Sequence, residues 1–197
     1  GEEFGLPAGK NTIGKIFTAL RMLGFDTVFD TSFSADLTVI EEANELLYKL
    51  KNGEQKYPLG NSLPLFTSCC PAWVRFVETK YPELLPYVST CKSPMEMFGA
   101  VLKEYYKPAD EEAGMETVSV AVMPCVAKKH EAAREEFKRN EVPDVDYVIT
   151  TKELILMIKE LGIQFDEIEP SAPDMPFSIN SGAGVIFGVT GGVMEAA

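Results

Sequence analysis

Residues 118–125 read Val-Ser-Val-Ala-Val-Met-Pro-Cys, and they carry the strongest strand signal in the chain. The run is rich in β-branched and apolar residues, and Pro124 ends it. Downstream, the sequence predicts a helix over 128–139, a strand over 145–150 and a helix that Thr151 caps. Strands that alternate with helices of about ten or more residues are typical of a mainly parallel sheet flanked by helices. The predicted fold class is therefore α/β.

Upstream of this stretch, the same spacing rules predict further helices and short strands. The helix over 35–51 has a broad apolar face, which we expect to be buried, and a charged face, which we expect to be solvated. The remaining predicted elements are helices over 13–23, 71–77 and 93–106, strands over 27–29 and 63–66, and a Gly-, Pro- and Ser-rich loop over 171–192 that leads into a helix reaching Ala197.

Composition and charge narrow the class of protein. Of the 197 residues, 46% are apolar and 24% are charged, which is typical of a globular protein. A formal net charge of −12 argues against non-specific nucleic-acid binding, which depends on Lys and Arg. No apolar run approaches the length of a membrane span, and no leader opens the chain, so we expect neither a span nor secretion. No linker divides residues 1–197.

Four cysteines are present, and two of the motifs that contain them follow predicted strands. Cys69 and Cys70 precede Pro71, and Cys125 follows Pro124. Ligands of parallel α/β sheets bind beyond the carboxyl ends of strands, so we expect both motifs to face one crevice. The helix starts after the two prolines would favour an anionic cofactor there.

Spacing alone leaves several uses open for these cysteines. No Cys-x-x-Cys pair exists, which argues against a zinc ribbon or a thioredoxin-type site. Thiolates select iron–sulfur clusters, zinc or copper(I), whereas a free cysteine is commonly a small buried apolar residue. A nucleophilic cysteine would need a histidine base, and His130, which we expect to be solvated, is the only histidine.

The charged side chains of two helices suggest a solvated surface when they are taken by themselves. Glu42, Glu45 and Lys49 stand at i, i+3 and i+7, which predicts one exposed face with an ordinary ion pair. Glu131 and Glu135 on a later helix are interpreted in the same way.

Two longer motifs resemble those of a known family. Thr67-Ser-Cys-Cys-Pro-Ala-Trp73 and Met123-Pro-Cys-Val-Ala-Lys-Lys-His-Glu131 resemble the first and second signature motifs of the iron-only ([FeFe]) hydrogenases. The resemblance covers essentially the whole chain, through segments 36–42, 92–94, 148–154, 181–188 and 190–196. It implies a catalytic domain of two lobes, each with a mainly parallel sheet. The chain would hold most of one lobe and part of the second.

The resemblance also implies an activity, a cofactor and partners. Members of the family reversibly reduce protons to hydrogen at the H-cluster, a [4Fe-4S] cubane joined through a cysteine sulfur to a di-iron unit with carbonyl, cyanide and dithiolate ligands. The implied partners are ferredoxin or a similar electron carrier and the H-cluster maturation proteins, with no nucleic acid. The default compartment is the cytoplasm, and the periplasm and the hydrogenosome occur in the family.

Roles for individual residues follow from the same resemblance. Cys70 and Cys125 match cubane ligands, and Lys128 matches a lysine that hydrogen-bonds a cyanide. The pocket residues implied for the di-iron unit are Met123, Pro124 and Phe187, with Met123 and Phe187 as apolar walls.

A proton path is implied as well. Cys69 matches the cysteine whose thiol passes protons to the dithiolate, and Glu45, Ser89 and Glu42 match successive stations from Cys69 to the surface. Lys49 stands where the family often has an arginine, which keeps the charge and loses the planar fork. Cys91 and His130 match nothing functional.

The chain also departs from the family pattern. The third motif, with the remaining two cysteines, would lie beyond Ala197, and a short Ala-Pro segment would precede Gly1. With two of four ligands, we expect the fragment alone to hold a cubane weakly and to turn over little hydrogen. The alternatives are an iron–sulfur-binding, hydrogenase-like scaffold of cluster assembly and a sensory module. Retention of Cys69, Cys70 and Lys128 favours the hydrogenase.

Overall fold

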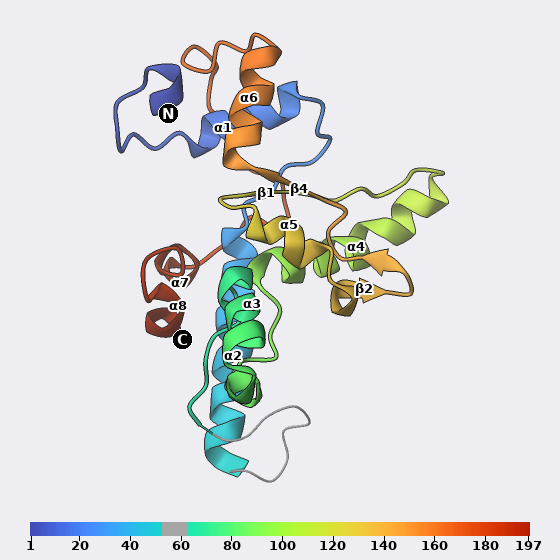
Figure 1. Ribbon diagram of the computed structural model, residues 1–197. Coiled ribbons are helices and arrows are strands. Elements are labelled where there is room, and N and C mark those ends of the chain that lie inside the picture. The colour runs from blue at the N-terminus through green and yellow to red at the C-terminus, as the bar shows by residue number, and fades with distance from the viewer. Residues whose placement is uncertain (53–62) are drawn as a thin grey trace. The chain divides into compact units, whose positions relative to one another are not determined.

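The computed structural model describes residues 1–52 and 63–197, and helices make up most of its regular structure (Figure 1). None of the described helices is both long and apolar enough to cross a membrane. The α-helices are α1 (Ile13–Met22), α2 (Ser32–Asn52), α3 (Pro71–Lys80), α4 (Pro94–Glu112), α5 (Ala127–Ala132), α6 (Thr151–Glu160), α7 (Gly182–Ile186) and α8 (Gly192–Ala196). The strands are β1 (Val120–Met123), β2 (Lys138–Arg139), β3 (Val142–Pro143) and β4 (Tyr147–Thr150), and the 3₁₀ helices are η1 (Glu2–Phe4), η3 (Pro82–Tyr87) and η4 (Glu135–Phe137).

The chain folds into two compact units, each built from segments that lie far apart in the sequence. Unit 1 contains Gly1–Asp30, Val122–Cys125 and Ile149–Ile179, and unit 2 contains Thr31–Ala121, Val126–Val148 and Asn180–Ala197. Strand β1 pairs with β4, and β2 pairs with β3 in an antiparallel ribbon. The fold is mixed α/β, with a parallel sheet and helices, so the predicted fold class is confirmed.

Unit 1 has an apolar core between α1 and α6. Phe17 and Leu20 of α1 meet Leu154 and Ile158 of α6, and all four side chains are buried. A capping box opens α6: the Thr150 hydroxyl accepts from the Glu153 amide, and the Glu153 carboxylate accepts from the Thr150 amide. The cap is therefore Thr150, one residue before the predicted Thr151.

Unit 2 is built around α2, which packs against α4 and α7. Close approaches of the backbone in this unit require glycine at several positions, two of which lie in α4 and α7. A Cβ at Gly99 of α4 would collide with the carbonyl oxygen of Asp144, and a Cβ at Gly184 of α7 would lie 2.5 Å from the carbonyl oxygen of Ser32. Helix α4 runs to Glu112, beyond the predicted end near residue 106.

Several predicted elements are wrong in type or length. Neither 27–29 nor 63–66 is a strand in the structure: the second forms only an isolated parallel bridge between Phe66 and Val88. The predicted helix over 128–139 ends at Ala132. Arg134 has an extended backbone, and its guanidinium group pairs with Glu78 and Glu136. The 3₁₀ helix η4 and the strand β2 follow. The predicted loop over 171–192 contains the unpredicted helix α7, whereas α8 agrees with the helix predicted after this loop.

Helix α2 buries a different face from the predicted one. The apolar side chains of Ile40, Leu47 and Leu50 are exposed, although their spacing predicts a buried stripe. Polar and charged residues of the same helix lie inside instead, which places them where a buried site can form.

Candidate functional site

Three charged side chains are buried along one face of α2. Glu42, Glu45 and Lys49 are 2%, 3% and 2% exposed, so their interpretation as a solvated face is wrong. The Ser89 hydroxyl donates to Glu45 Oε2 at 2.7 Å, and the Thr90 amide donates to the same oxygen at 3.2 Å. Lys49 Nζ lies 2.9 Å from Glu45 Oε1. Because burying a charge is costly without a partner, these contacts explain how Glu45 is accommodated.

Glu42 lies between this group and the first cysteine motif. Its Oε1 accepts from the Ser68 amide at 3.3 Å, next to Cys69 in the chain. Burial raises the pKa of Glu42 and the Glu45 charge adds to the effect, while the Ser68 amide and the Ser89 hydroxyl partly offset it. The contacts therefore favour the order Cys69, Glu42, Ser89, Glu45, the reverse of the predicted one. We call Glu42, Ser89 and Glu45 the carboxylate row.

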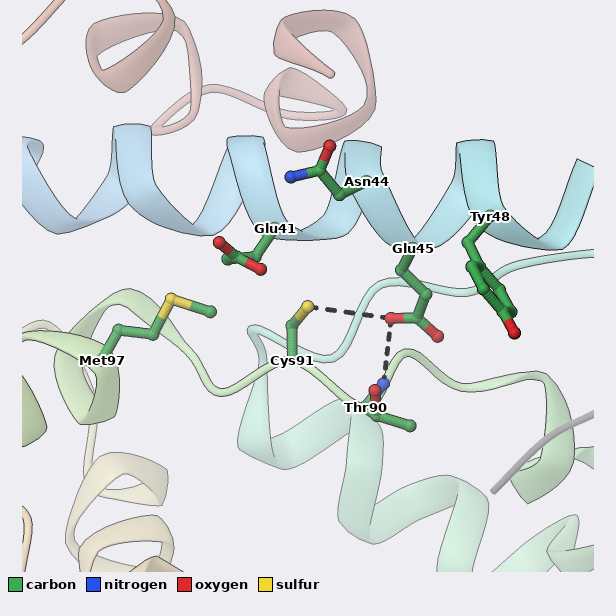
Figure 2. Close-up of a pocket in the computed structure, with 7 residues that line it drawn as sticks. All are labelled: Glu41, Asn44, Glu45, Tyr48, Thr90, Cys91 and Met97. Atoms are coloured by element: carbon green, nitrogen blue, oxygen red, sulfur yellow. Dashed lines mark hydrogen bonds between the residues drawn. The ribbon is translucent and has the colours of Figure 1, made fainter. Parts of the chain in front are cut away.

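A cavity of about 450 Å³ opens beside Glu45, as Figure 2 shows. The Cys91 thiol donates to Glu45 Oε2 at 3.7 Å, and burial is the main reason that the pKa of Cys91 is raised to about 12. Cys91 thus stays a thiol beside the row, where the sequence predicted no functional role. The signal for it was its position two residues after Ser89, whose hydroxyl accepts from the Cys91 amide at 3.1 Å. The cavity is lined by Glu41, Asn44, Glu45, Tyr48, Thr90, Cys91 and Met97.

The doubled cysteine places two thiols in different surroundings. Cys69 is half-buried, and its pKa is raised to about 11, first by burial and then by the Glu42 charge, with Lys128 acting in the opposite direction. Cys70 is exposed and is the N-cap of α3, with Pro71 at the start of the helix. The environment of Cys69 therefore favours a proton-carrying thiol, and that of Cys70 leaves its sulfur accessible.

Lys128 links the two signature motifs through its ammonium group. Its Nζ donates to the Cys69 carbonyl oxygen at 3.0 Å and to Glu131 Oε2 at 2.7 Å. Glu131 is buried, so the solvated interpretation is wrong for it, whereas Glu135 is exposed as expected. The i, i+3 spacing of Lys128 and Glu131 was the signal for this ion pair.

The second cysteine motif begins in unit 1. Met123 ends β1 and is buried, and its carbonyl oxygen accepts from the Thr151 hydroxyl at 3.5 Å. Pro124 and Cys125 follow and are exposed, with the Cys125 thiol free. Cys125 thus lies directly after a strand, as predicted.

The prediction that Cys70 and Cys125 bind one shared cluster stays a prediction. Cys70 belongs to unit 2 and Cys125 to unit 1, and each unit is described by itself. Among residues 1–52 and 63–197, no three His, Cys, Asp or Glu side chains gather as a metal site. Phe187, directly after α7, is half-buried, and its role as a pocket wall also stays a prediction.

The four thiols should differ in their rates of alkylation. At neutral pH, we expect iodoacetamide to label Cys70 and Cys125 first, because both are exposed. Cys69 and Cys91 should react at least about tenfold more slowly, because raised pKa values leave little thiolate. Mass spectrometry of peptides after timed quenching measures the four rates. Equal rates for Cys69 and Cys70 would contradict the proton-carrying assignment of Cys69.

The family model for the iron-only hydrogenase large subunit, C-terminal domain, matches residues 1–197. The chain belongs to this hydrogenase family. The resemblance seen in the two cysteine motifs is therefore confirmed over the whole chain.

Curated hydrogenases are among the most similar relatives. The NADP-reducing hydrogenase subunit HndD of Solidesulfovibrio fructosivorans is 48% identical over 200 residues, and iron hydrogenase 1 of Clostridium pasteurianum is 47% identical over 197 residues. Both alignments cover 100% of this chain, and they cover 34% and 33% of the relatives. The chain thus spans about a third of the length of these hydrogenases.

Solved hydrogenase structures agree with the fold. A structure from work on stepwise assembly of the [FeFe]-hydrogenase H-cluster matches with a TM-score of 0.80 and 46% identity, over 98% of this chain and 47% of that chain. A variant of apo [FeFe]-hydrogenase HydA1 from Chlamydomonas reinhardtii gives the same TM-score and identity, over 98% of this chain and 48% of that one.

Relatives that are named as cluster-assembly factors are more distant: the cytosolic Fe-S cluster assembly factor narfl of Xenopus tropicalis is 32% identical over 171 residues, with 85% of this chain and 35% of that protein covered. Protein NAR1 of Arabidopsis thaliana is 36% identical over 189 residues, with 90% of this chain and 40% of that protein covered. The assembly-scaffold alternative is therefore less well supported than the hydrogenase.

Proposed function

We propose that this chain forms part of the catalytic domain of an [FeFe]-hydrogenase that reversibly reduces protons to hydrogen. In this proposal the chain supplies the proton path and two of the thiolate ligands. The remaining ligands would come from sequence outside residues 1–197. By itself the chain would have little or no activity.

The observation that carries the proposal is the buried carboxylate row next to a thiol that keeps its proton. Glu45 accepts from Ser89 at 2.7 Å, and Glu42 lies beside the cysteine turn. A hydroxyl between two carboxyl groups can accept a proton from one and donate to the other. Such a row serves proton delivery, which a purely structural core does not need.

The side chains around Lys128 fit the anionic group that the family carries. The Lys128 ammonium group is mostly buried and donates to two oxygen acceptors. Because an ammonium group has three N–H donors, it can also donate to a cyanide ligand. The exposed Cys70 and Cys125 thiols fit iron, for which thiolates are preferred ligands. When bound, the H-cluster would relay electrons from the carrier and provide the metal at which protons are reduced. Cys69 would hold the last protein-borne proton, and Met123, Pro124 and Phe187 would exclude water.

The partners and the compartment follow from the same proposal. Ferredoxin or a similar carrier would deliver electrons, and maturation proteins would deliver the di-iron unit. We propose the cytoplasm as the compartment; one relative carries the name periplasmic [Fe] hydrogenase large subunit.

Iron binding by cysteine variants of the whole protein tests the ligand assignment. After anaerobic reconstitution, Cys70→Ala and Cys125→Ala should each lose most of the bound iron, because a cubane deprived of one thiolate is held weakly. Iron and acid-labile sulfide per protein are measured together with hydrogen evolution from a chemical reductant.

The matched control is Cys91→Ala, which removes a thiol that points at Glu45 instead of a metal. It should retain iron at the level of the parent protein. If neither Cys70→Ala nor Cys125→Ala reduces the iron content, the ligand roles are wrong. Iron binding without any hydrogen evolution in the parent protein would favour the assembly scaffold.

A further inference from the structure

A third buried carboxylate, Glu96, lies in the first turn of α4 and belongs to neither the carboxylate row nor the Lys128–Glu131 pair. Its side chain is 0% exposed. Neither of its carboxylate oxygens has a hydrogen-bond partner within residues 1–52 and 63–197. An isolated ionised carboxylate in such a place is very costly, so something must neutralise it.

The charged side chains that face Glu96 come from three segments of unit 2. Both lysines among them already form ion pairs with other carboxylates. Glu131 and Lys128 lie on α5, Asp144 precedes β4, and Lys92 precedes α4. Lys128 is held by Glu131 at 2.7 Å, and Lys92 is held by Asp144. Two ammonium groups thus balance two carboxylates, and the charge of Glu96 would be in excess. A proton on Glu96 restores the balance.

We propose that Glu96 is a positioning residue that stores one exchangeable proton beside the Lys128–Glu131 ion pair. This proton is distinct from those of the carboxylate row. The proposal rests on the proposed function only for the identity of the group to which Lys128 would donate. Burial, with the Glu131 and Asp144 charges adding to it, raises the pKa of Glu96 to about 8. The carboxyl is therefore protonated at neutral pH and loses its proton above about pH 8.

A second cavity lies next to Glu131, one of the charged residues that face Glu96. The cavity has a volume of about 180 Å³, and Glu131, Ser93 and Arg134 are among the residues that line it. Ser93 is buried, and within the described part of the chain its hydroxyl has no hydrogen-bond partner. A polar cavity of this size has room for water. On release of the proton, the O–H bond of Glu96 breaks and water takes up the proton.

Loss of the proton changes the field at Lys128. A negative Glu96 competes with Glu131 and with the Cys69 carbonyl oxygen for the Lys128 ammonium group. Protonated Glu96 leaves Lys128 on those two acceptors, at 2.7 and 3.0 Å. Glu96 therefore acts through Lys128 and touches no reacting atom itself.

Infrared difference spectroscopy of the whole protein between about pH 6 and about pH 10 tests the store. The parent protein should show the carbonyl stretch of a protonated carboxyl group, which disappears with a midpoint at about pH 8. Glu96→Gln, which keeps the shape, should lack this band, and the control Glu116→Gln, at an exposed site, should retain it. The band needs no bound metal, so the result is independent of whether the protein evolves hydrogen.

A second variant tests the link to the ion pair. Glu131→Gln removes a neighbouring negative charge and frees Lys128, so the midpoint of the Glu96 band should fall by about one pH unit or more. A band with its midpoint at about pH 8 that persists in Glu96→Gln, or that is absent from the parent protein at neutral pH, overturns the proposal. An unchanged midpoint in Glu131→Gln overturns the coupling to Lys128.

Discussion

Replacing Glu45 with Gln is expected to slow hydrogen evolution by the whole protein about 100-fold or more, which is the usual scale for a lost proton-transfer group. Gln keeps the size of Glu45 and can still accept from the Ser89 hydroxyl, but its amide cannot take up a proton and release it. Ser89→Ala should act in the same direction, because it removes the hydroxyl that lies 2.7 Å from Glu45. Initial rates with a chemical reductant measure the effect.

Glu41→Gln is the matched control for this change. Glu41 lies on the same helix and lines the same cavity as Glu45, but it is exposed and outside the carboxylate row (Figure 2). It should leave the rate within about twofold of the parent protein. Iron content must stay equal in all variants, because a lost cluster would imitate a lost proton path. If Glu45→Gln keeps both its iron and its rate, the row does not carry the protons.

Local sequence signals predicted most helices and the position of one cysteine turn. Proline marks the start of α3 and α4, and helical spacing of apolar residues marks α1 and α6, since these signals act within one or two turns. The second cysteine turn was correctly placed, since Cys125 follows β1, whereas the strand predicted before Cys70, the N-cap of α3, is absent.

Burial of charge could not be predicted in this way, because it depends on segments that meet only in the folded unit. Helix α2 buries Glu42, Glu45 and Lys49 and exposes Ile40 and Leu47, against the pattern of its own sequence. The Ser89 and Ser68 segments that compensate its carboxylates lie more than twenty residues away in the chain. The family resemblance named Glu42 and Glu45, but the order that we propose for them along a proton path required the contacts.

The predictions of short strands were wrong for a related reason. Residues 63–66 are apolar enough for a strand, but a strand needs a partner along its length. In the structure only Phe66 finds one, at Val88. The predicted helix over 128–139 failed because the guanidinium of Arg134 finds Glu78 of α3, a contact that no local rule contains.

Replacing Lys49 with Met should lower the free energy of unfolding by about 3–5 kcal/mol, the usual cost of removing one partner of a buried ion pair. Lys49 Nζ lies 2.9 Å from Glu45 Oε1, and the two side chains are 2% and 1% exposed. Met nearly matches the volume of the lysine stem, so little cavity forms. The decrease in the free energy of unfolding therefore comes mainly from the unpaired charge of Glu45. Urea unfolding followed by circular dichroism measures the change.

Two further variants separate charge from packing. Lys49→Arg keeps the positive charge and should cost less than Lys49→Met. Adding Glu45→Gln to Lys49→Met removes the unpaired carboxylate and should recover about 0.5–3 kcal/mol, which is the range of coupling energies for residues in contact. The recovered protein should still evolve hydrogen slowly, because it lacks the proton-accepting group at position 45. Additive effects of the two changes would mean that the ion pair does not explain how α2 tolerates a buried Glu45, and solvent within the cavity beside Cys91 would then have to stabilise that charge.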